Sequence, residues 1–528
     1  MSRFAMPSRA RRPAGHAGID TGLGGAVLAA LLVSAPPAFA ATDYEVWVSD
    51  QANTQGFSAA APTGTHGGRL WIHDGANLER TPPVDKPMTL DASKDLFPTA
   101  DVSTGAHVAR LHGIMPSPDH RFMALNFVAS GHLGIVDGRT KRPLCLFRAT
   151  GSSTGRQNHM SIWAPSGRSL LVANQNGRLL ERVDVKRGDD GAVTGFDFNA
   201  AASLDLVGGA GRIVAQPVAA DMDGGDGIAC TVSGTVADGQ PTTTPTGAPK
   251  QAAGLRPANT LICPIPSSSD QHAFATLGGG GMFVVDMRST PMTIVAEYDT
   301  RLVRAAGCGG VEAAGFMHLN TGTPAANVSE FTLYRFPLAY PSAPSFNPAN
   351  SPAPVAVWAD PDNGKQAGAA LPAGGNRDAH GLVLARDPRS GAPRYLHQMD
   401  RIRNNVEVFR LAPPWNDLAG SHAGSYSLSG SGACGATAGA ARSDDPTPDL
   451  GDFSVGRVPR IYVALRGPAP LTVSHAADGS CPGLGIVTLS SDLKSGKLSH
   501  VLPTTVLGTD GTKNLSDPHA VVVRRKAR

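Results

Sequence analysis

Residues 111–139 read LHGIMPSPDHRFMALNFVASGHLGIVDGR, and this stretch decides the fold predicted for the chain. Three short apolar runs alternate there with turns. The first run ends at the turn 117–119 (SPD), the second spans 122–127, and the third ends at the turn 137–138 (DG). Asp and Gly supply the backbone angles that tight antiparallel turns need. The stretch therefore predicts three consecutive antiparallel strands.

The same unit recurs along the chain, with further copies that begin near Gln157, Asn259, Gly307, Arg377 and Pro448. A last fragment, residues 517–523, carries only the first strand of a unit. Its missing strands occur at the other end of the chain, at 44–48 and 69–74. Six whole units and one split unit predict an all-β fold, a seven-bladed β-propeller whose last blade is closed by N- and C-terminal strands.

The first forty residues have the pattern of a signal peptide. A basic start (Arg3, Arg9, Arg11 and Arg12) precedes an apolar run at 22–33 and a small-residue cleavage site at 38–40. The apolar run is too short to span a bilayer unaided. We therefore expect residues 1–40 to be removed and the mature chain, from about Ala41, to be periplasmic or extracellular without a membrane span.

Residues 41–528 are expected to form a single propeller domain with three long insertions, 187–258, 340–376 and 412–447. All three are rich in small residues or proline and cannot bury much apolar surface, so loops over one end of the ring are expected. A lid is the alternative interpretation. The net charge is only +3 and the basic residues are scattered, which argues against nucleic acid as a partner. A monomer is expected.

Metal-competent side chains recur at one register of the repeat, seven residues before the first turn of each unit. This register contains His112, His159, Cys263, Cys308, His380, Asp449 and His519. The position begins the innermost strand, and equivalent strand positions point the same way. All seven side chains are therefore expected to surround one mouth of the central channel. Thiolate and imidazole ligands suit copper or zinc.

Each of these residues also has a structural interpretation. A histidine at this position can simply hydrogen-bond the backbone of the next blade. Cys263 and Cys308 lie on adjacent blades and can form a disulfide in an oxidising compartment. Asp449 can cap a turn. These alternatives remain open at the level of sequence.

The remaining cysteines are Cys145, Cys230, Cys434 and Cys481. Cys434 and Cys481 lie in Gly-rich loops on either side of the last whole unit, so they are predicted to pair. A rival pairing, Cys230 with Cys263, would tie down the insertion 187–258 and remove Cys263 from the ring.

The unit 112–119 (HGIMPSPD) and the segment 403–409 (RNNVEVF) resemble YVTN-type β-propeller repeats. The resemblance implies a superfamily that includes the propellers of nitrous oxide reductase and cytochrome nitrite reductase and lactonase-like propellers. Segments such as LGGGGMFVVD (277–286) and SDPHAVVVR (516–524) also resemble a group of uncharacterised secreted bacterial propellers. The fold is implied more specifically than any activity, because one fold hosts many functions.

Three hypotheses about function follow. In the first, the propeller is a non-catalytic binder of a small molecule, metal or protein ligand at the channel mouth. In the second, it is a copper- or zinc-dependent periplasmic oxidoreductase, by analogy with nitrous oxide reductase. In the third, it is a lactonase-like hydrolase, which would need a His, Arg and Glu set around a divalent cation. The sequence does not assign catalytic residues for any of these activities.

Overall fold

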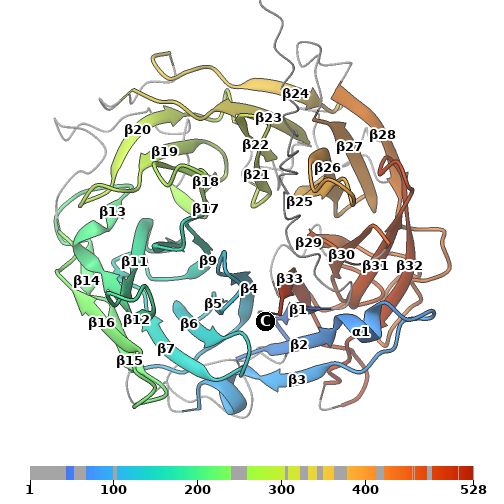
Figure 1. Cartoon of the computed structure of the whole chain (residues 1–528), viewed down its shortest axis with the longest axis horizontal. Coiled ribbons are helices and arrows are strands. Elements are labelled where there is room, and N and C mark those ends of the chain that lie inside the picture. The colour runs from blue at the N-terminus through green and yellow to red at the C-terminus, as the bar shows by residue number, and fades with distance from the viewer. Residues whose placement is uncertain are drawn as a thin grey trace, which may run out of the picture. The chain divides into compact units, whose positions relative to one another are not determined.

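The computed structural model describes residues 43–52, 67–98, 104–238, 259–303, 307–320, 331–341, 349–361, 377–411, 421–454, 456, 458–471, 478–508 and 510–526. Their strands form seven antiparallel blades around a central axis (Figure 1). The first strand of each blade lies nearest the axis. The predicted seven-bladed β-propeller is therefore confirmed, whereas the expected signal peptide lies outside the described residues.

We number the blades I to VII and give each from its inner to its outer strand. Blade I contains β4 (Leu111–Pro116), β5 (Phe122–Phe127), β6 (His132–Asp137) and β7 (Pro143–Arg148). Blade II contains β9 (Asn158–Trp163), β10 (Ser169–Asn174), β11 (Leu179–Arg187) and β12 (Val193–Asn199). Blade III contains β17 (Thr260–Pro266), β18 (His272–Gly278), β19 (Met282–Asp286) and β20 (Thr293–Tyr298). Blade IV contains β21 (Gly310–Ala313), β22 (Phe316–Asn320), β23 (Thr332–Pro337) and β24 (Val355–Ala359).

Blade V contains β25 (Ala379–Arg386), β26 (Pro393–Asp400), β27 (Asn405–Arg410) and β28 (His422–Ser427). Blade VI contains β29 (Pro448–Phe453), β30 (Arg460–Leu465), β31 (Gly483–Leu489) and β32 (Gly496–Pro503). Blade VII contains β33 (Pro518–Arg525), β1 (Tyr44–Asp50), β2 (Arg69–Asp74) and β3 (Met88–Asp91). The short helices are α1 (Gly75–Leu78), η1 (Ala92–Leu96) and η2 (Ala200–Ala202). None of the helices among the described residues is long and apolar enough to cross a membrane.

Blade VII closes the ring as the sequence predicts. The C-terminal strand β33 is the innermost strand and pairs antiparallel with β1, from Tyr44 opposite Arg525 to Ser49 opposite Ala520. Seven of the eight residues of β33 are buried. The two ends of the propeller are therefore held together by one continuous strand pair.

The three expected loop insertions are more structured than predicted. Each supplies the outer strand of a blade: β12 in the first, β24 in the second and β28 in the third. The first insertion also contributes edge strands β13 (Leu204–Asp205), β14 (Ile213–Ala215), β15 (Val218–Asp221) and β16 (Ala229–Ser233), while β14 pairs with β8 (Gly151–Ser152). The loop expectation is thus corrected, because an outer strand gains stability from pairing with its neighbour in the sheet, which a local sequence pattern does not contain.

All six cysteines are paired in disulfides. The predicted Cys434–Cys481 bond is present. The rival Cys230–Cys263 pairing is wrong, because Cys230 on β16 bonds Cys145 on β7 and Cys263 bonds Cys308. The edge strand β16 pairs with β12 of blade II, and its disulfide joins it to β7 of blade I. Cys145 on β7 is the cysteine for which the sequence offered no partner.

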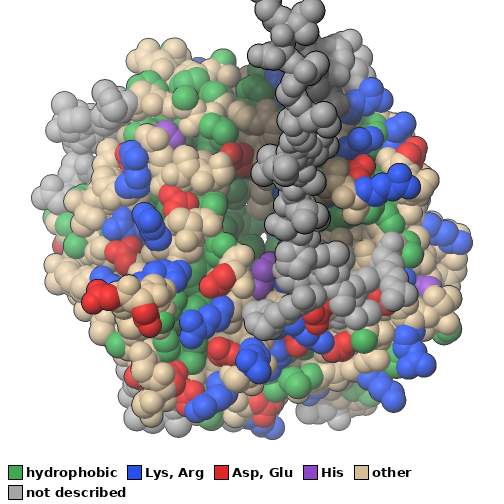
Figure 2. All heavy atoms as spheres, in the orientation of Figure 1, with side chains coloured by type: hydrophobic (Ala, Val, Ile, Leu, Met, Phe, Trp, Pro, Cys, Tyr) green, Lys and Arg blue, Asp and Glu red, His purple; other side chains and the backbone are tan. Residues whose placement is uncertain are grey.

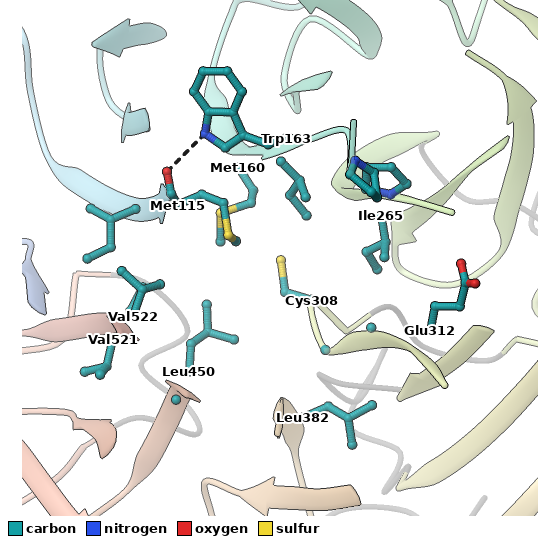
Figure 3. Close-up of a pocket in the computed structure, with 18 of the residues that line it drawn as sticks. Met115, Met160, Trp163, Ile265, Cys308, Glu312, Leu382, Leu450, Val521 and Val522 are labelled. Atoms are coloured by element: carbon teal, nitrogen blue, oxygen red, sulfur yellow. Dashed lines mark hydrogen bonds between the residues drawn. The ribbon is translucent and has the colours of Figure 1, made fainter. Parts of the chain in front are cut away.

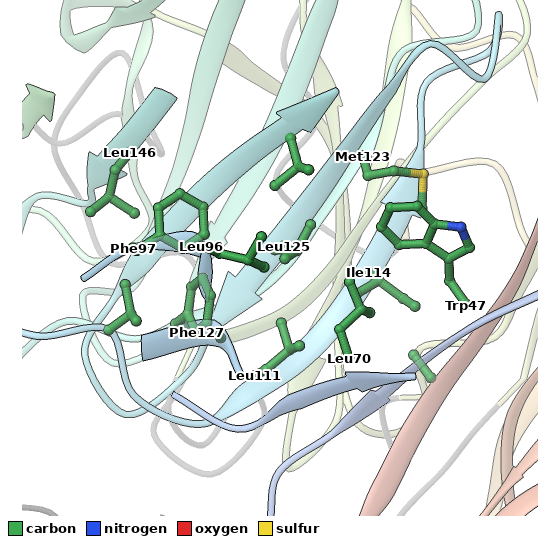
Figure 4. Close-up of a cluster of buried hydrophobic side chains, with 14 of the residues drawn as sticks. Trp47, Leu70, Leu96, Phe97, Leu111, Ile114, Met123, Leu125, Phe127 and Leu146 are labelled. Carbon is green, nitrogen blue, oxygen red and sulfur yellow. The ribbon is translucent and has the colours of Figure 1, made fainter. Parts of the chain in front are cut away.

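Apolar side chains fill the spaces between blades. In one such cluster, Trp47 and Leu70 of blade VII pack with Leu111, Met123 and Phe127 of blade I (Figure 4). Burying an aliphatic or aromatic side chain contributes about 1.5–3 kcal/mol. Interblade packing of this kind holds the inner strands, and hence the channel wall, in place.

Gly134 on β6 touches this cluster, and a side chain there should destabilise the protein. A β-carbon at Gly134 would lie 2.4 Å from the ring of Phe97. We expect Gly134→Ala to lower the free energy of unfolding by about 1–3 kcal/mol, because the core is close-packed. Thermal unfolding followed by circular dichroism measures this loss. Gly224→Ala is the matched control, since nothing lies within 4 Å of a β-carbon there; an equal loss in both variants would contradict the packing argument.

Candidate functional site in the central channel

The seven predicted ring positions begin the inner strands. His112, His159, His380, Asp449 and His519 are each the second residue of their strand. Cys263 lies in β17, and Cys308 lies two residues before β21. In blades I, V and VI the strand register shifts at this point, so that the ring residue is skipped in the ladder. Such bulges re-aim side chains and are common beside functional sites.

A continuous series of contacts joins the seven side chains. The imidazole of His112 stacks on that of His519, with ring centroids 3.5 Å apart, and lies 4.5 Å from that of His159. The ligand atoms of His380, Asp449 and His519 lie within 4.8 Å of one another, and those of His159, Cys263 and Cys308 form a second such group. The residues lie together; six of the seven are buried, and His159 is partly exposed. Metal binding by them remains a prediction.

Two residues of the predicted ligand set, Cys263 and Cys308, are joined in a disulfide in the structure. A thiolate is the metal ligand that cysteine provides, and a disulfide has none. With the bond intact, the candidate ligands are therefore the four histidines and Asp449. The disulfide alternative left open by the sequence is the arrangement found.

Hydrogen bonds orient two of the ring histidines. Nδ1 of His519 lies 3.0 Å from the backbone oxygen of His112, and Nδ1 of His159 lies 3.0 Å from that of Ile262. A carbonyl oxygen can only accept, so both Nδ1 atoms donate and both Nε2 atoms carry a lone pair. This tautomer, set by a backbone carbonyl, is the usual one for metal-binding histidines.

The ring histidines are neutral at neutral pH. Burial lowers the pKa of His159 to about 4 and that of His519 to about 3. Burial, together with neighbouring cationic and imidazole groups, holds the pKa values of His112 and His380 well below 6.5. Because imidazolium forms poorly there, the nitrogen lone pairs are available to a ligand without the loss of a bound proton.

Two buried arginines that the sequence interpretation missed support Asp449. Nη1 of Arg466 donates to Oδ2 of Asp449 at 2.6 Å, and Nη1 of Arg401 lies 3.5 Å from the same oxygen. Arg466 also binds both carboxylate oxygens of Asp517, and Arg401 binds Asp378. Burial alone would raise the pKa of Asp449, but the neighbouring histidines and these guanidinium groups hold it well below its usual value. Asp449 is therefore a carboxylate.

A pattern in the sequence could have revealed this network. Asp378 and Asp517 stand two residues before a ring histidine, and each arginine directly follows the second strand of its blade. The second strand ends where the first begins, so its last residues reach the same end of the channel. Counting only the first strand of each unit left these residues out.

Three buried polar atoms face this cluster without a hydrogen-bond partner. They are Nε2 of His112, Nε2 of His380 and Oδ1 of Asp449. The last two lie 3.4 Å apart. Adjacent ligands of a tetrahedral zinc ion lie roughly 3.3 Å apart, given bonds of about 2.0–2.1 Å. Unpaired buried polar atoms are costly, and the pair at His380 and Asp449 has the spacing of two ligands of one metal ion.

An apolar cavity of about 380 Å³ lies along the inner strands; its wall contains Cys308 and the residues that directly follow His159, Asp449 and His519 in the chain. Its wall includes Met160, Trp163, Ile265, Leu382 and Leu450 (Figure 3). Figure 2 shows that this face of the molecule is hollowed at its centre and that hydrophobic side chains border the hollow. The cavity therefore offers a small molecule an apolar wall next to a polar histidine cluster.

Glu312 contributes a carboxylate to the cavity wall. It accepts hydrogen bonds from the backbone nitrogen of Ser268, at 2.6 Å, and from the hydroxyl of the same serine.

Comparisons with known proteins add little beyond the fold. No protein-family model and no curated protein matches the chain. Among solved structures, a periplasmic gluconolactonase from Pseudomonas aeruginosa is similar at 12% identity and a TM-score of 0.43, covering 92% of this chain and 99% of that one. A protein from Lactobacillus plantarum has 10% identity and a TM-score of 0.46, with 91% and 99% covered.

Hydrazine synthase from Kuenenia stuttgartiensis is also similar, at 10% identity and a TM-score of 0.38, with 78% of this chain and 95% of that one covered. The propeller thus has a lactonase among its structural neighbours. At these identities and TM-scores the likeness carries no argument about activity. The YVTN resemblance remains a prediction.

Proposed function

We propose that this protein is an exported β-propeller that binds a transition-metal ion, zinc or copper, inside its central channel. The proposed ligands are His112, His380, Asp449 and His519. The observation that carries the proposal is that ligand atoms of His380, Asp449 and His519 lie within 4.8 Å of one another, and that Nε2 of His380 and Oδ1 of Asp449 have no hydrogen-bond partner. Three neutral imidazoles and one carboxylate form a donor set suited to these metals.

The proposed function also includes binding of a small molecule, which the apolar cavity next to these residues supports. A small molecule held against the cavity wall would meet the metal through any coordination position left open.

The three disulfides support export, since disulfides persist in oxidising compartments. No contact among the described residues specifically favours the oxidoreductase hypothesis. Nor does any contact among the described residues favour the lactonase hypothesis, since Glu312 accepts hydrogen bonds from Ser268.

Metal content and thermal stability together test the proposal. Protein purified without chelator is expected to contain zinc or copper. Adding either ion to chelator-treated protein should raise the melting temperature, by the equivalent of about 2.7 kcal/mol at a hundredfold excess over the Kd. The absence of both metals, with no stabilisation by either, would rule the site out.

Variants locate the site. His380→Ala and His519→Ala are each expected to abolish the metal-dependent rise in melting temperature, whatever their effect on the metal-free protein. His500→Ala on the outer strand β32 is the matched control and should keep the full rise. A rise that persists in both ring variants would place the metal elsewhere.

A further inference from the structure

One of the three disulfides lies at the wall of the central cavity. Cys263 and Cys308 join the inner strands of blades III and IV, and Cys308 lines the cavity (Figure 3). The bond Cys145–Cys230 joins outer strands, and Cys434–Cys481 joins two loops. A small reductant entering the cavity would therefore meet the Cys263–Cys308 bond.

A histidine faces this disulfide. A ring nitrogen of His159 and the sulfurs of Cys263 and Cys308 all lie within 4.8 Å of one another. Nδ1 of His159 donates to the backbone oxygen of Ile262, so Nε2 carries the lone pair. This is the support that a backbone carbonyl gives to metal-binding histidines. Two sulfurs and an imidazole are thus gathered at one point.

We propose that reduction of the Cys263–Cys308 disulfide creates a zinc site formed by two thiolates and His159, with a coordination position open to the cavity. This site is distinct in its residues from the cation site proposed above. It would exist only in the reduced protein, because intact disulfide sulfurs are not thiolates. A dithiol is the class of reductant required.

The chemistry balances as follows. The dithiol supplies two electrons and two protons, the S–S bond between Cys263 and Cys308 breaks, and each sulfur becomes a thiol. The dithiol is oxidised to its own disulfide. Zinc then binds the two sulfurs as thiolates and releases their two protons to solvent.

Charge favours Zn²⁺ over Cu⁺ at this place. Two thiolates and a neutral imidazole cancel the charge of Zn²⁺, whereas with Cu⁺ the complex keeps one negative charge. A net charge is costly where Cys263 is fully buried and Cys308 is only 8% exposed. Two cysteines, one histidine and an open position also form a ligand set known for catalytic zinc. In the reduced site, a ligand in the cavity would therefore reach the metal through the open coordination position.

Zinc binding before and after reduction tests this proposal on the full mature protein. The protein is treated with dithiothreitol without oxygen, freed of reductant by gel filtration, and titrated with zinc. Reduced protein is expected to bind one more zinc ion per chain than oxidised protein. With cobalt in place of zinc, reduction should produce thiolate-to-cobalt absorption in the near ultraviolet.

Two variants separate this site from its alternatives. C263A/C308A should lose the additional zinc while its other cysteines still become reduced, and His159→Gln should lose tight cobalt binding while its disulfide still forms. His380→Ala should leave the cobalt–thiolate absorption unchanged, which distinguishes this site from the first. The proposal is overturned if reduced wild-type protein binds no additional zinc, if the disulfide resists dithiothreitol in the folded protein, or if either cysteine or histidine variant behaves as wild type.

Discussion

Deletion of residues 516–528 is expected to prevent stable folding of the propeller. The deletion removes β33, the innermost strand of blade VII, and exposes the edge of β1 along its full length. The buried valines at positions 521–523 alone represent about 5 kcal/mol of hydrophobic burial. That loss is comparable with the whole stability of a typical domain. Expression yield, circular dichroism and thermal unfolding measure the effect.

A shorter deletion provides the control. Removing only residues 526–528 leaves β33 complete and removes the part-exposed ion pair between Lys526 and Asp74. Exposed pairs contribute about 0–1 kcal/mol, so this variant should melt close to the parent protein. If the longer deletion also melts at the parent temperature, ring closure by β33 does not stabilise the protein.

Arg466→Met is expected to lower the free energy of unfolding by about 3–5 kcal/mol. Arg466 is completely buried and bridges Asp449 and Asp517, with contacts of 2.6 Å to each. Without its guanidinium group, buried carboxylates on blades VI and VII lose their main counter-charge. Desolvated charges without partners are strongly unfavourable, and the methionine side chain supplies no hydrogen bond. Chemical denaturation of both proteins measures the difference.

Two further variants sharpen this test. Arg288→Met removes an ion pair with Asp286 in which the arginine is 58% exposed, and because exposed pairs contribute little to stability, it should destabilise the protein far less than R466M. R466M/D517N removes one of the stranded charges and should recover part of the loss caused by R466M. Equal destabilisation by R288M and R466M, or a double variant that is less stable than R466M, would contradict the buried-charge argument.

The fold could be predicted from sequence because the strand-and-turn pattern that specifies it is local and repeated. Each apolar run with its Asp or Gly turn predicts one strand pair, and six copies with a split seventh leave one way to close a ring. The outer strand β28 was missed because its sequence, HAGSYS, has few apolar residues, whereas β24, VAVWA, was missed because it is a single short apolar run inside a stretch rich in Pro, Ala and Asn. Such a strand is stabilised by its neighbour in the sheet, which the local pattern does not contain.

The candidate site was predicted in part for the same reason. Repeat register alone placed His112, His159, His380 and His519 at equivalent positions, and the structure brings them together. Register could not decide between a disulfide and two thiolates at Cys263 and Cys308, because that depends on the separation of two blades in space.

The sequence by itself thus determined the number of blades, the strand that closes the ring and the chemical types of side chain around the channel. Only the tertiary structure decided that Arg401 and Arg466 hold Asp449, and that unpartnered atoms of His380 and Asp449 lie 3.4 Å apart. These contacts join blades far apart in the chain. Their energies depend on burial and on distances of a few ångströms, and neither quantity can be deduced from a local pattern of residues.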